Sequence, residues 1–409
     1  MATTQNLFQQ DLGRSKPKLD LLKCMHEARA RQGKSYAAQI GDILRLGLGD
    51  GHITALDYFY YRLSDDTLYP LPEKRRFLSD SISFRITTKC CDVHWWATAD
   101  DKLLAYLILA AHGVRVPETQ AAYCLTGRNC GRVRKLDSAE SLARFLAREA
   151  RYPLFAKPIG GIGSFGACRI EGENDGVLAF SDGSRLPAAA FAARLDAGSG
   201  YLLQTVLAPH PDLHGIVDTV STVRLVVILE GGRPQILHTI WKLPAGGNVA
   251  DNFWRPGNIL ADVEPATGVV RRAMRGFGPA TEELDKHPDS GRPITGVVLP
   301  HWQEVKSLCL ECAPIFVGLR YQSWDIALTP EGPVVVEVNT GSAFNLPQLA
   351  TGRGMLTDRF RAFLRDCGYQ PELLKSGSRL GSGYNLDVRG TLHKPFGVSE
   401  LQSALQWLE

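Results

Sequence analysis

Residues 325–339, DIALTPEGPVVVEVN, contain two strand-like runs separated by a Pro-Glu-Gly-Pro turn. Side chains alternate between the two faces of a strand, so Glu337 and Asn339 are predicted on one face of the second strand. A tight hairpin would bring Asp325 back beside them. Three oxygen-bearing side chains at one sheet edge suit Mg²⁺. An ordinary hairpin with exposed charged residues is an equally good interpretation of this stretch alone.

A glycine-rich turn lies far upstream, between two further strand-like runs. The run at 154–158 ends in Lys157 and Pro158, residues 159–166 read IGGIGSFG, and a second run covers 167–171. Backbone N–H groups in such a turn can close over phosphate oxygens, because glycine has no side chain to keep an anion away. No Gly-Lys-Ser/Thr follows, so this is not a Walker loop. Together with the hairpin, the turn predicts a nucleotide site.

In the order of these motifs the chain resembles the ATP-grasp superfamily, which includes D-alanine–D-alanine ligase and glutathione synthetase. Within it, the chain is similar to the sugar-transfer-associated ATP-grasp proteins and to alpha-L-glutamate ligase-like proteins, from about residue 98 to about residue 366. The resemblance implies an α+β ATP-grasp fold, with two α+β subdomains clamping ATP between them. The expected parts are a mainly helical N-terminal region (1–97), a small subdomain with the glycine-rich flap (98–206), a large subdomain with the metal site (207–368), and a C-terminal linker and helix (369–409).

The resemblance also implies roles for individual residues. The expected nucleotide contacts come from two lysines, the glycine loop and a hinge strand that binds adenine: Lys102, Lys157, Gly160, Gly161, Gly163, Ser164, Gln204 and Val206. The residues expected to act on the reacting phosphate or acyl group are Arg224, Lys242 and Asn252. The expected metal ligands are Asp325, Glu337 and Asn339.

Two stretches depart from the family pattern. After Asp251 and Asn252, where a glycine pair is expected, residues 255–258 read RPGN, which predicts a reshaped loop. Gln204 stands where many relatives have Glu, and it would contact base or ribose without a charge. Neither change removes a metal ligand or a phosphate-binding lysine, so we expect an active site.

The activity that the resemblance implies is a two-step ligation. ATP phosphorylates a carboxylate, releasing ADP, and an amine, hydroxyl or thiol then attacks the acyl phosphate. ATP and Mg²⁺ are the expected cofactors, with two ions bound and Mn²⁺ as a substitute. The expected partners are a small-molecule or peptide carboxylate and an acceptor, most simply an amine. Two alternatives stay open: an ATP-grasp kinase, phosphotransferase or ligase in sugar or polysaccharide metabolism, and a nucleotide-binding regulatory protein without turnover.

The composition is that of a globular enzyme. The 409 residues exceed one hydrophobic core, so two or three domains are expected. A net charge of +3 favours neither nucleic acid nor a membrane as a partner. The chain has no run of eighteen apolar residues and no apolar signal core, and its nine cysteines are scattered. These features predict a cytoplasmic protein, with a homodimer as the default oligomer.

Apolar residues at helical spacing predict several helices. They cover 19–31, 37–46, 54–63, 99–112 (opened by Thr98 and ended by Gly113), 302–316 and 399–408. The basic run at 74–76 is predicted to be a solvated face. Cys309 and Cys312 are predicted to fill a core rather than to form a redox pair, since no second cysteine pair offers a zinc site.

Overall fold

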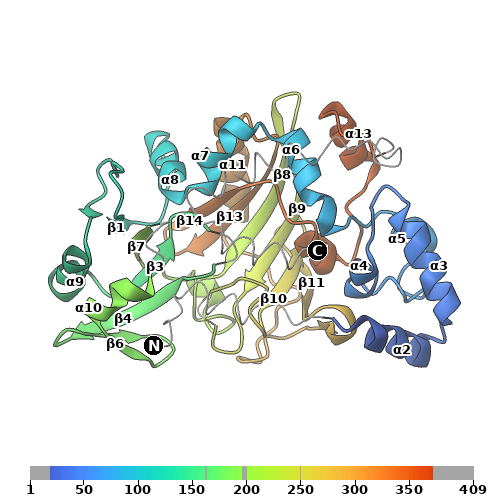
Figure 1. Ribbon diagram of the computed structural model, residues 1–409, viewed down its shortest axis with the longest axis horizontal. Helices are drawn as coiled ribbons and strands as arrows, with labels where there is room; N and C mark the ends of the chain where they lie inside the picture. Colours follow the sequence, from blue (N-terminus) through green and yellow to red (C-terminus); the bar gives the residue numbers. More distant parts are fainter. Residues whose placement is uncertain (1–18, 162–163, 196–199, 249, 372–409) are drawn as a thin grey trace. The chain divides into compact units, whose positions relative to one another are not determined.

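The computed structural model describes residues 19–161, 164–195, 200–248 and 250–371. They form two compact units: residues 100–207, and residues 19–99 together with 208–371. Each unit contains a seven-stranded sheet with helices, so the predicted α+β class is confirmed (Figure 1). The predicted helix at 399–408 lies outside the described residues. Among the described helices, none is long and apolar enough to span a lipid bilayer.

The unit of residues 100–207 is built on a sheet with the strand order β2-β1-β7-β3-β4-β5-β6. Only the β1–β2 pair is parallel. The strands are β1 (Thr119–Tyr123), β2 (Lys135–Leu136), β3 (Leu154–Pro158), β4 (Cys168–Asn174), β5 (Val177–Phe180), β6 (Arg185–Pro187) and β7 (Tyr201–Thr205). The helices are α8 (Lys102–Ala111), α9 (Ala139–Arg148), α10 (Ala188–Phe191) and the 3-10 helix η3 (Ala192–Arg194).

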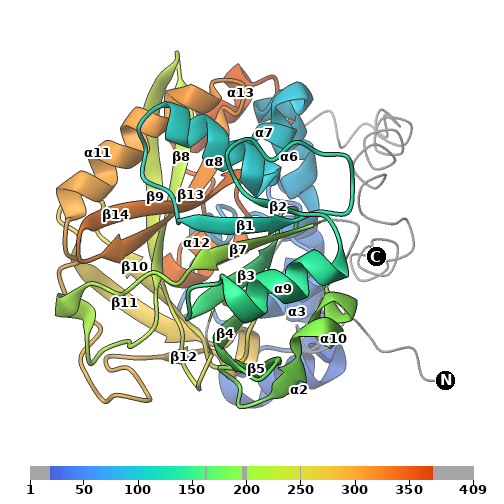
Figure 2. The same cartoon turned by 90° about the vertical axis from the view of Figure 1, so that its left-hand side faces the viewer.

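Helices cover both faces of this first sheet. Ala121 of β1 packs in one core with Phe145 of α9, and Figure 2 shows α9 lying along the sheet. The next residue, Ala122, points to the opposite face and packs in a second core with Leu103 and Tyr106 of α8. The strand that carries Lys157 therefore lies in a sheet that is buried on both sides.

The start of α8 differs from the sequence prediction. Asp101 caps this helix by accepting a hydrogen bond from the Leu104 N–H at 2.9 Å, and Lys102 is the first helical residue. The prediction that Thr98 opens the helix is wrong, because Thr98 lies inside the separate short helix α7 (Trp96–Asp100). Asp101 caps α8 because its carboxylate accepts from the Leu104 N–H, whereas the Thr98 hydroxyl donates to the Trp95 carbonyl at 2.6 Å.

The second unit is built on an antiparallel sheet whose main strands are longer than those of the first sheet, with the order β12-β11-β10-β9-β8-β13-β14. Its strands are β8 (Thr222–Glu230), β9 (Arg233–Leu243), β10 (Ile259–Val263), β11 (Val270–Arg275), β12 (Glu282–Glu283), β13 (Tyr321–Thr329) and β14 (Gly332–Thr340). The later helices are η4 (Pro211–Leu213), η5 (Gly278–Ala280), α11 (Trp302–Cys312), η6 (Ala313–Phe316), α12 (Asn345–Thr351) and α13 (Asp358–Asp366).

One face of this second sheet packs on the segment α11–η6. Trp324 of β13 contacts Phe316 edge-on, and the Gln322 amide donates to the carbonyls of Ala313, Phe316 and Leu319. Cys309 and Cys312 are buried in α11 as free thiols, which confirms that they fill a core. Because side chains alternate along β13, Ser323 and Asp325 point to the other face.

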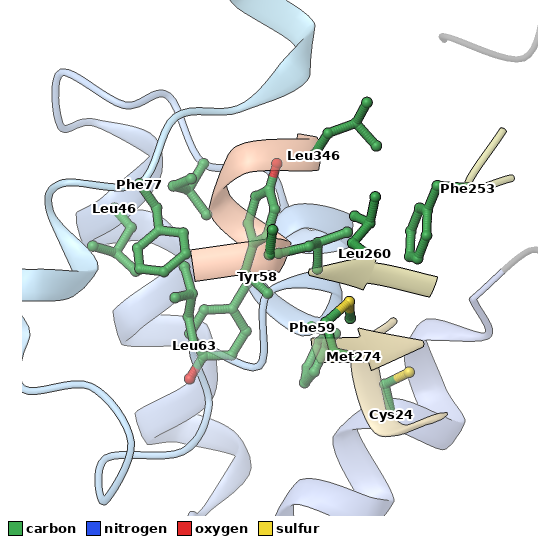
Figure 3. Close-up of a cluster of buried hydrophobic side chains, with 14 of the residues drawn as sticks. Cys24, Leu46, Tyr58, Phe59, Leu63, Phe77, Phe253, Leu260, Met274 and Leu346 are labelled. Atoms are coloured by element: carbon green, nitrogen blue, oxygen red, sulfur yellow. The ribbon is translucent and has the colours of Figure 1, made fainter. Parts of the chain in front are cut away.

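The N-terminal helices are α2 (Leu21–Gln32), α3 (Tyr36–Gly47), α4 (Ala55–Tyr60), α5 (Leu71–Lys74), η1 (Asp80–Ile82), α6 (Ser83–Cys90) and η2 (Val93–Trp95), together with α7. The predicted helices at 19–31, 37–46 and 54–63 correspond to the first three. Their apolar side chains join Leu260 and Met274 of the sheet and Leu346 of α12 in one buried cluster (Figure 3). Residues 19–99 are thus part of the core of the second unit.

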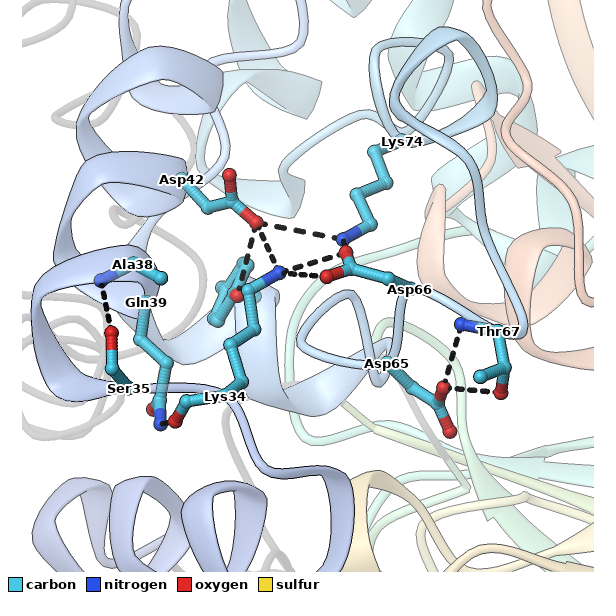
Figure 4. Close-up of polar contacts among 10 residues, drawn as sticks. Lys34, Ser35, Ala38, Gln39, Asp42, Asp65, Asp66, Thr67 and Lys74 are labelled. Carbon is cyan, nitrogen blue, oxygen red and sulfur yellow. Dashed lines mark hydrogen bonds and ion pairs between the residues drawn. The ribbon is translucent and has the colours of Figure 1, made fainter.

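An ion cluster around the ammonium groups of Lys34 and Lys74 links these N-terminal helices (Figure 4). The ammonium of Lys34 lies 2.5 Å from an Asp42 oxygen and 2.8 Å from Asp66, and Lys74 pairs with the same two carboxylates. The prediction that the basic run at 74–76 is solvated is wrong for Lys74, which is 1% exposed. Burial of this lysine is possible because two carboxylates, 32 and 8 residues away in the sequence, neutralise it.

Replacing Lys74 with Met is expected to lower the free energy of unfolding by about 1–3 kcal/mol, the cost of leaving a hydrogen-bonded group without its partner. Asp42 keeps Lys34 as a partner, which limits the loss. Urea unfolding of the wild type and the variant measures the difference. The control is Arg75→Met at the exposed neighbouring position, expected to change stability by about 0.5 kcal/mol or less. Equal losses of stability in Lys74→Met and Arg75→Met would contradict the conclusion that buried ion pairs of Lys74 stabilise the fold.

Candidate active site

The predicted hairpin is present as β13 and β14, joined by a two-residue turn between Thr329 and Gly332. Asp325 lies directly opposite Glu337, and Ser323 lies opposite Asn339. The register shifts between Asp325 and the next residue, because Ile326 pairs with Val335 and leaves an extra residue on β14. Such bulges re-aim side chains next to functional sites. The hairpin therefore presents Asp325, Glu337 and Asn339 on one face.

Asp325 is the centre of a buried charge cluster. Arg224, its direct neighbour on β8, donates from Nε to Oδ1 at 2.8 Å and from Nη2 to Oδ2 at 2.6 Å. Lys242 of β9 donates from Nζ to Oδ2 at 3.1 Å. Asp325 is 3% and Lys242 7% exposed. Bidentate geometry and burial make these charge-assisted contacts strong.

The same contacts set the ionisation of the pair. Burial alone would raise the pKa of Asp325, but the charges of Arg224 and Lys242 outweigh it and hold this pKa well below its ordinary value. Burial works against the charged form of Arg224, but Asp325, with Glu337 and Asp251 beyond it, keeps the arginine pKa above its ordinary value. Both groups are charged at neutral pH.

A loop extends the cluster from Lys242. Asp251 lies 3.4 Å from the Lys242 Nζ and accepts from both the N–H (2.8 Å) and the hydroxyl of Thr222. The predicted catalytic residue Asn252 follows in the same loop, where its side-chain oxygen accepts from the Trp254 N–H at 3.2 Å. In this loop the fully buried Asn258 donates to the carbonyls of Ala250 and Asn252, at 2.7 Å each.

The residues on this face suit a divalent cation. Asp325, Glu337 and Asn339 supply only oxygen ligands, as Mg²⁺ requires. Asp325 accepts three hydrogen bonds, whereas a carboxylate has about four acceptor sites, so it retains capacity for a further contact. No group of three or more His, Cys, Asp or Glu suited to a metal occurs within the described ranges. A metal here would use the two acids Asp325 and Glu337 and the amide oxygen of Asn339.

The other unit holds the two predicted phosphate-binding lysines. Lys102, at the start of α8, donates from Nζ to the carbonyl of Gly161 at 3.0 Å. Lys157, on β3, donates to the hydroxyl of Tyr106 at 2.7 Å and lies over the same ring. Since Tyr106 is one turn after Lys102 on α8, both ammonium groups lie along one helix. The structure thus brings the two lysines and the glycine loop together.

The glycine loop and the hinge strand are also located. Gly161 has φ of 137° and Ser164 has φ of 58°, backbone conformations that favour glycine and small polar residues. Gly163 lies outside the described residues. The predicted hinge residue Gln204 is 2% exposed on β7 and donates to the Thr119 hydroxyl at 3.0 Å. The Val206 N–H donates to the Pro153 carbonyl at 3.4 Å. Whether these groups contact adenine stays a prediction.

Three partners of the predicted residues were missed in the sequence. Tyr106 contacts Lys157, and Asp251 and Thr222 extend the Lys242 cluster. The signal for Tyr106 was its position four residues after Lys102, on the same helix face. Asp251 stood next to Asn252 in the motif taken from the family resemblance, but its pairing with Thr222 had no local signal, because it spans 29 residues.

Tyr106→Phe is expected to lower the free energy of unfolding by about 1–3 kcal/mol, because a buried ammonium loses a hydrogen-bond acceptor. The control is Tyr152→Phe in the same unit, which removes a neutral bond of 2.7 Å to the Leu146 carbonyl and should cost about 0.5–1.5 kcal/mol. Urea unfolding of both variants measures the losses. If Tyr106→Phe left the free energy of unfolding unchanged, the contact with Lys157 would not stabilise this unit.

The chain resembles known proteins to different extents. No curated protein matches the chain. Among solved structures, biotin carboxylase from Campylobacter jejuni is 14% identical, with a TM-score of 0.40, and the match covers 67% of this chain and 47% of that one. VanG D-Ala:D-Ser ligase from Enterococcus faecalis is 15% identical, with a TM-score of 0.37 and coverage of 67% and 64%. For the L-amino acid ligase from Bacillus licheniformis the values are 11%, 0.35, 65% and 48%.

The chain spans about half the length of the biotin carboxylase and of the L-amino acid ligase. The family comparison is more extensive. Residues 83–363 match the model of the sugar-transfer associated ATP-grasp proteins. This segment includes both predicted lysines, the glycine loop, the charge cluster and the β13–β14 hairpin. The chain therefore belongs to the sugar-transfer associated ATP-grasp family.

Proposed function

We propose that the protein is an ATP- and Mg²⁺-dependent ligase that joins a carboxylate to an amine and releases ADP and phosphate. In the first step a carboxylate oxygen attacks the γ-phosphorus of ATP, the bond to the β-phosphate oxygen breaks, and an acyl phosphate forms. In the second step the amine attacks the acyl carbon, and phosphate leaves as the amine loses a proton. The reaction balances without an oxidant or a reductant.

The observation that carries the proposal is the row of charged residues across β8, β13 and β14. Arg224, Asp325 and Glu337 are successive cross-strand neighbours, with Lys242 attached to the same aspartate. Phosphoryl transfer needs fixed cations for the spreading negative charge and oxygen ligands for a metal. This row supplies both from rigid strands.

The proposed roles follow from these positions. Arg224 and Lys242 would balance negative charge on the transferred phosphoryl group and on the acyl phosphate. In the other unit, Lys102 and Lys157 would bind nucleotide phosphates, and the backbone around Gly161 would cover them. Mg²⁺, when bound to Glu337, Asn339 and Asp325, would polarise the phosphate oxygens. Asp251 would orient Lys242 from its loop, and Asn252, the next residue, would act at the reacting phosphate or acyl group, as the family resemblance implies.

A second candidate is phosphoryl transfer to a sugar hydroxyl. The description of the family as sugar-transfer associated favours it, and the same cations would serve this transfer. The two reactions differ in the acceptor of the phosphoryl group, which is a carboxylate in the ligase and a hydroxyl in the phosphotransferase.

Mass spectrometry of reaction mixtures tests the choice. The protein is incubated with Mg·ATP and a pool of carboxylic acids, with and without a pool of amines, and separately with a pool of sugars. The ligase should give ADP and a condensed acid–amine product only when both pools are present. A stable phosphorylated sugar would establish the second candidate instead. ATP cleavage to AMP and pyrophosphate would contradict both.

A further inference from the structure

Two cysteines that are far apart in the sequence meet in the second unit. Cys90 is the last residue of α6, and Cys367 directly follows α13. These two helices pack against each other (Figure 1). The Cys90 thiol donates a hydrogen bond to the sulfur of Cys367, so the two sulfur atoms are in direct contact. A disulfide spans only a short distance, and this contact meets its first requirement.

Arg320 holds the backbone on both sides of this contact. Its N–H donates to the Cys90 carbonyl at 3.0 Å. Its guanidinium pairs with Asp366, the residue before Cys367, and lies over the ring of Phe363. The Cys367 N–H in turn donates to the Phe363 carbonyl at 3.0 Å. The two cysteines are therefore fixed next to each other, with a permanent positive charge beside them.

The two thiols differ in exposure and in ionisation. Cys90 is 2% exposed, whereas Cys367 is half-buried. The hydrogen bond from Cys90 and the positive charge of Arg320 hold the pKa of Cys367 below its ordinary value, against its partial burial and the charge of Asp366. The same hydrogen bond, together with burial, raises the pKa of Cys90. Cys367 thus has the larger thiolate fraction, and the thiolate is the form that reacts with oxidants.

The cysteine pair of α11 shows that two neighbouring cysteines are not enough. Cys309 and Cys312 are both buried. Burial raises the pKa of Cys309 well above its ordinary value and that of Cys312 to about 12. Such thiols stay protonated and inert. A partly exposed thiolate beside a cation, with a second thiol in contact, is instead the arrangement of oxidant-sensitive cysteines.

We propose that Cys367 and Cys90 form a reversible oxidation site for hydroperoxides, in which Cys367 reacts first and Cys90 resolves the product as a disulfide. The Cys367 thiolate attacks one peroxide oxygen, the O–O bond breaks, and a sulfenic acid forms while the other oxygen leaves and takes up a proton. The Cys90 sulfur then attacks the sulfenic sulfur. The S–O bond breaks, and the hydroxide leaves as water with the proton of Cys90.

The electrons of this reaction balance. The two thiols lose two electrons and the hydroperoxide gains them, so that one disulfide, one water and one further water or alcohol result. Neither cysteine has a role in the proposed ligation. The oxidation site therefore goes beyond the proposed function and does not depend on it.

Peptide mapping by mass spectrometry tests the proposal on the full-length protein after treatment with hydrogen peroxide. Free thiols are blocked with iodoacetamide, and trypsin digests the protein without reduction. The peptides that begin after Lys89 and after Arg365 should appear as one cross-linked species, two hydrogen atoms lighter than their sum. Dithiothreitol should separate them. Fragmentation should place the link on Cys90 rather than on Cys91, which lies in the same peptide.

Single variants separate the two roles. In Cys90→Ser, peroxide should convert Cys367 to a sulfenic acid that dimedone traps, because the resolving thiol is missing. In Cys367→Ser, Cys90 should remain a free thiol. The matched control is Cys168→Ser, at the half-buried cysteine of β4 in the other unit, which should form the disulfide as the wild type does.

Four results would overturn the site. They are an absence of the cross-linked peptide in the treated wild type, a link from Cys367 to Cys91, a link between two copies of the chain on a non-reducing gel, and oxidation of Cys168 as fast as that of Cys367. Thermal unfolding of the reduced proteins checks the fold of each variant. The map of the wild type decides between these outcomes without any substitution.

Discussion

Replacing Glu337 with Gln is expected to reduce ATP turnover by about 100-fold or more while the fold stays intact. Glu337 is the cross-strand neighbour of Asp325 and shares its face with Asn339. Gln keeps the size and one oxygen of the side chain but loses the charge that a divalent cation needs. Weaker binding of Mg·ATP should accompany the loss. ADP release and the Mg²⁺ dependence of the rate measure both effects.

The matched control for this variant is Glu331→Gln, which removes a carboxylate from the turn of the same hairpin. Glu331 accepts from the Thr329 hydroxyl at 3.3 Å and lies at the opposite end of β14 from Asn339. Its substitution should change the rate by less than about twofold. ADP formation in Glu337→Gln at the wild-type rate would remove Glu337 from the metal site.

Replacing Asp325 with Asn is expected to lower the free energy of unfolding by about 3–5 kcal/mol, the cost of leaving buried charges without a counter-ion. The guanidinium of Arg224 and the ammonium of Lys242 would both lose their shared carboxylate. Denaturant unfolding measures the loss. A double variant, Asp325→Asn with Arg224→Gln, should recover part of it, because one of the two stranded cations is removed. A single variant as stable as the wild type would show that the cluster does not contribute to folding.

The contribution of Asp325 to stability also predicts that the free energy of unfolding depends on pH. The pKa of Asp325 is lower in the folded state than the value of about 3.9 expected for an unfolded aspartate. Its stabilising effect is therefore fully present above that value and is lost as pH falls below it. The difference in unfolding free energy between wild type and Asp325→Asn should be constant from about pH 5 upward and should narrow below about pH 4.

Features with a local pattern could be predicted from the sequence. The β13–β14 hairpin follows from alternation and a turn, and the strand before the glycine loop follows from a short apolar run. Lys102 and Lys157 were identified with their loop, and the structure joins Lys102 to Gly161. The family was recognised from the order of these motifs, and the match over residues 83–363 confirms it.

Features that depend on long-range pairing could not be predicted. Arg224 and Asp325 are 101 residues apart, and only the pairing of β8 with β13 makes them neighbours. The sequence assigned them separate roles, catalytic and metal-binding, whereas the structure joins them in one ion pair. Lys74 was misplaced at the surface for the same reason, since Asp42 lies 32 residues away. The predicted start of α8 was wrong because Thr98 and Asp101 are both residue types that can cap a helix, and the structure uses Asp101.

The central claim is that ATP phosphorylates a carboxylate and so activates it, and transfer of an oxygen isotope tests this most directly. The acid identified from the pooled assay is labelled with ¹⁸O in both carboxylate oxygens and incubated with Mg·ATP and its amine. An acyl phosphate intermediate predicts that each turnover releases ADP and one phosphate carrying a single ¹⁸O from the acid. Release of unlabelled phosphate, or of AMP carrying the label, would contradict the mechanism.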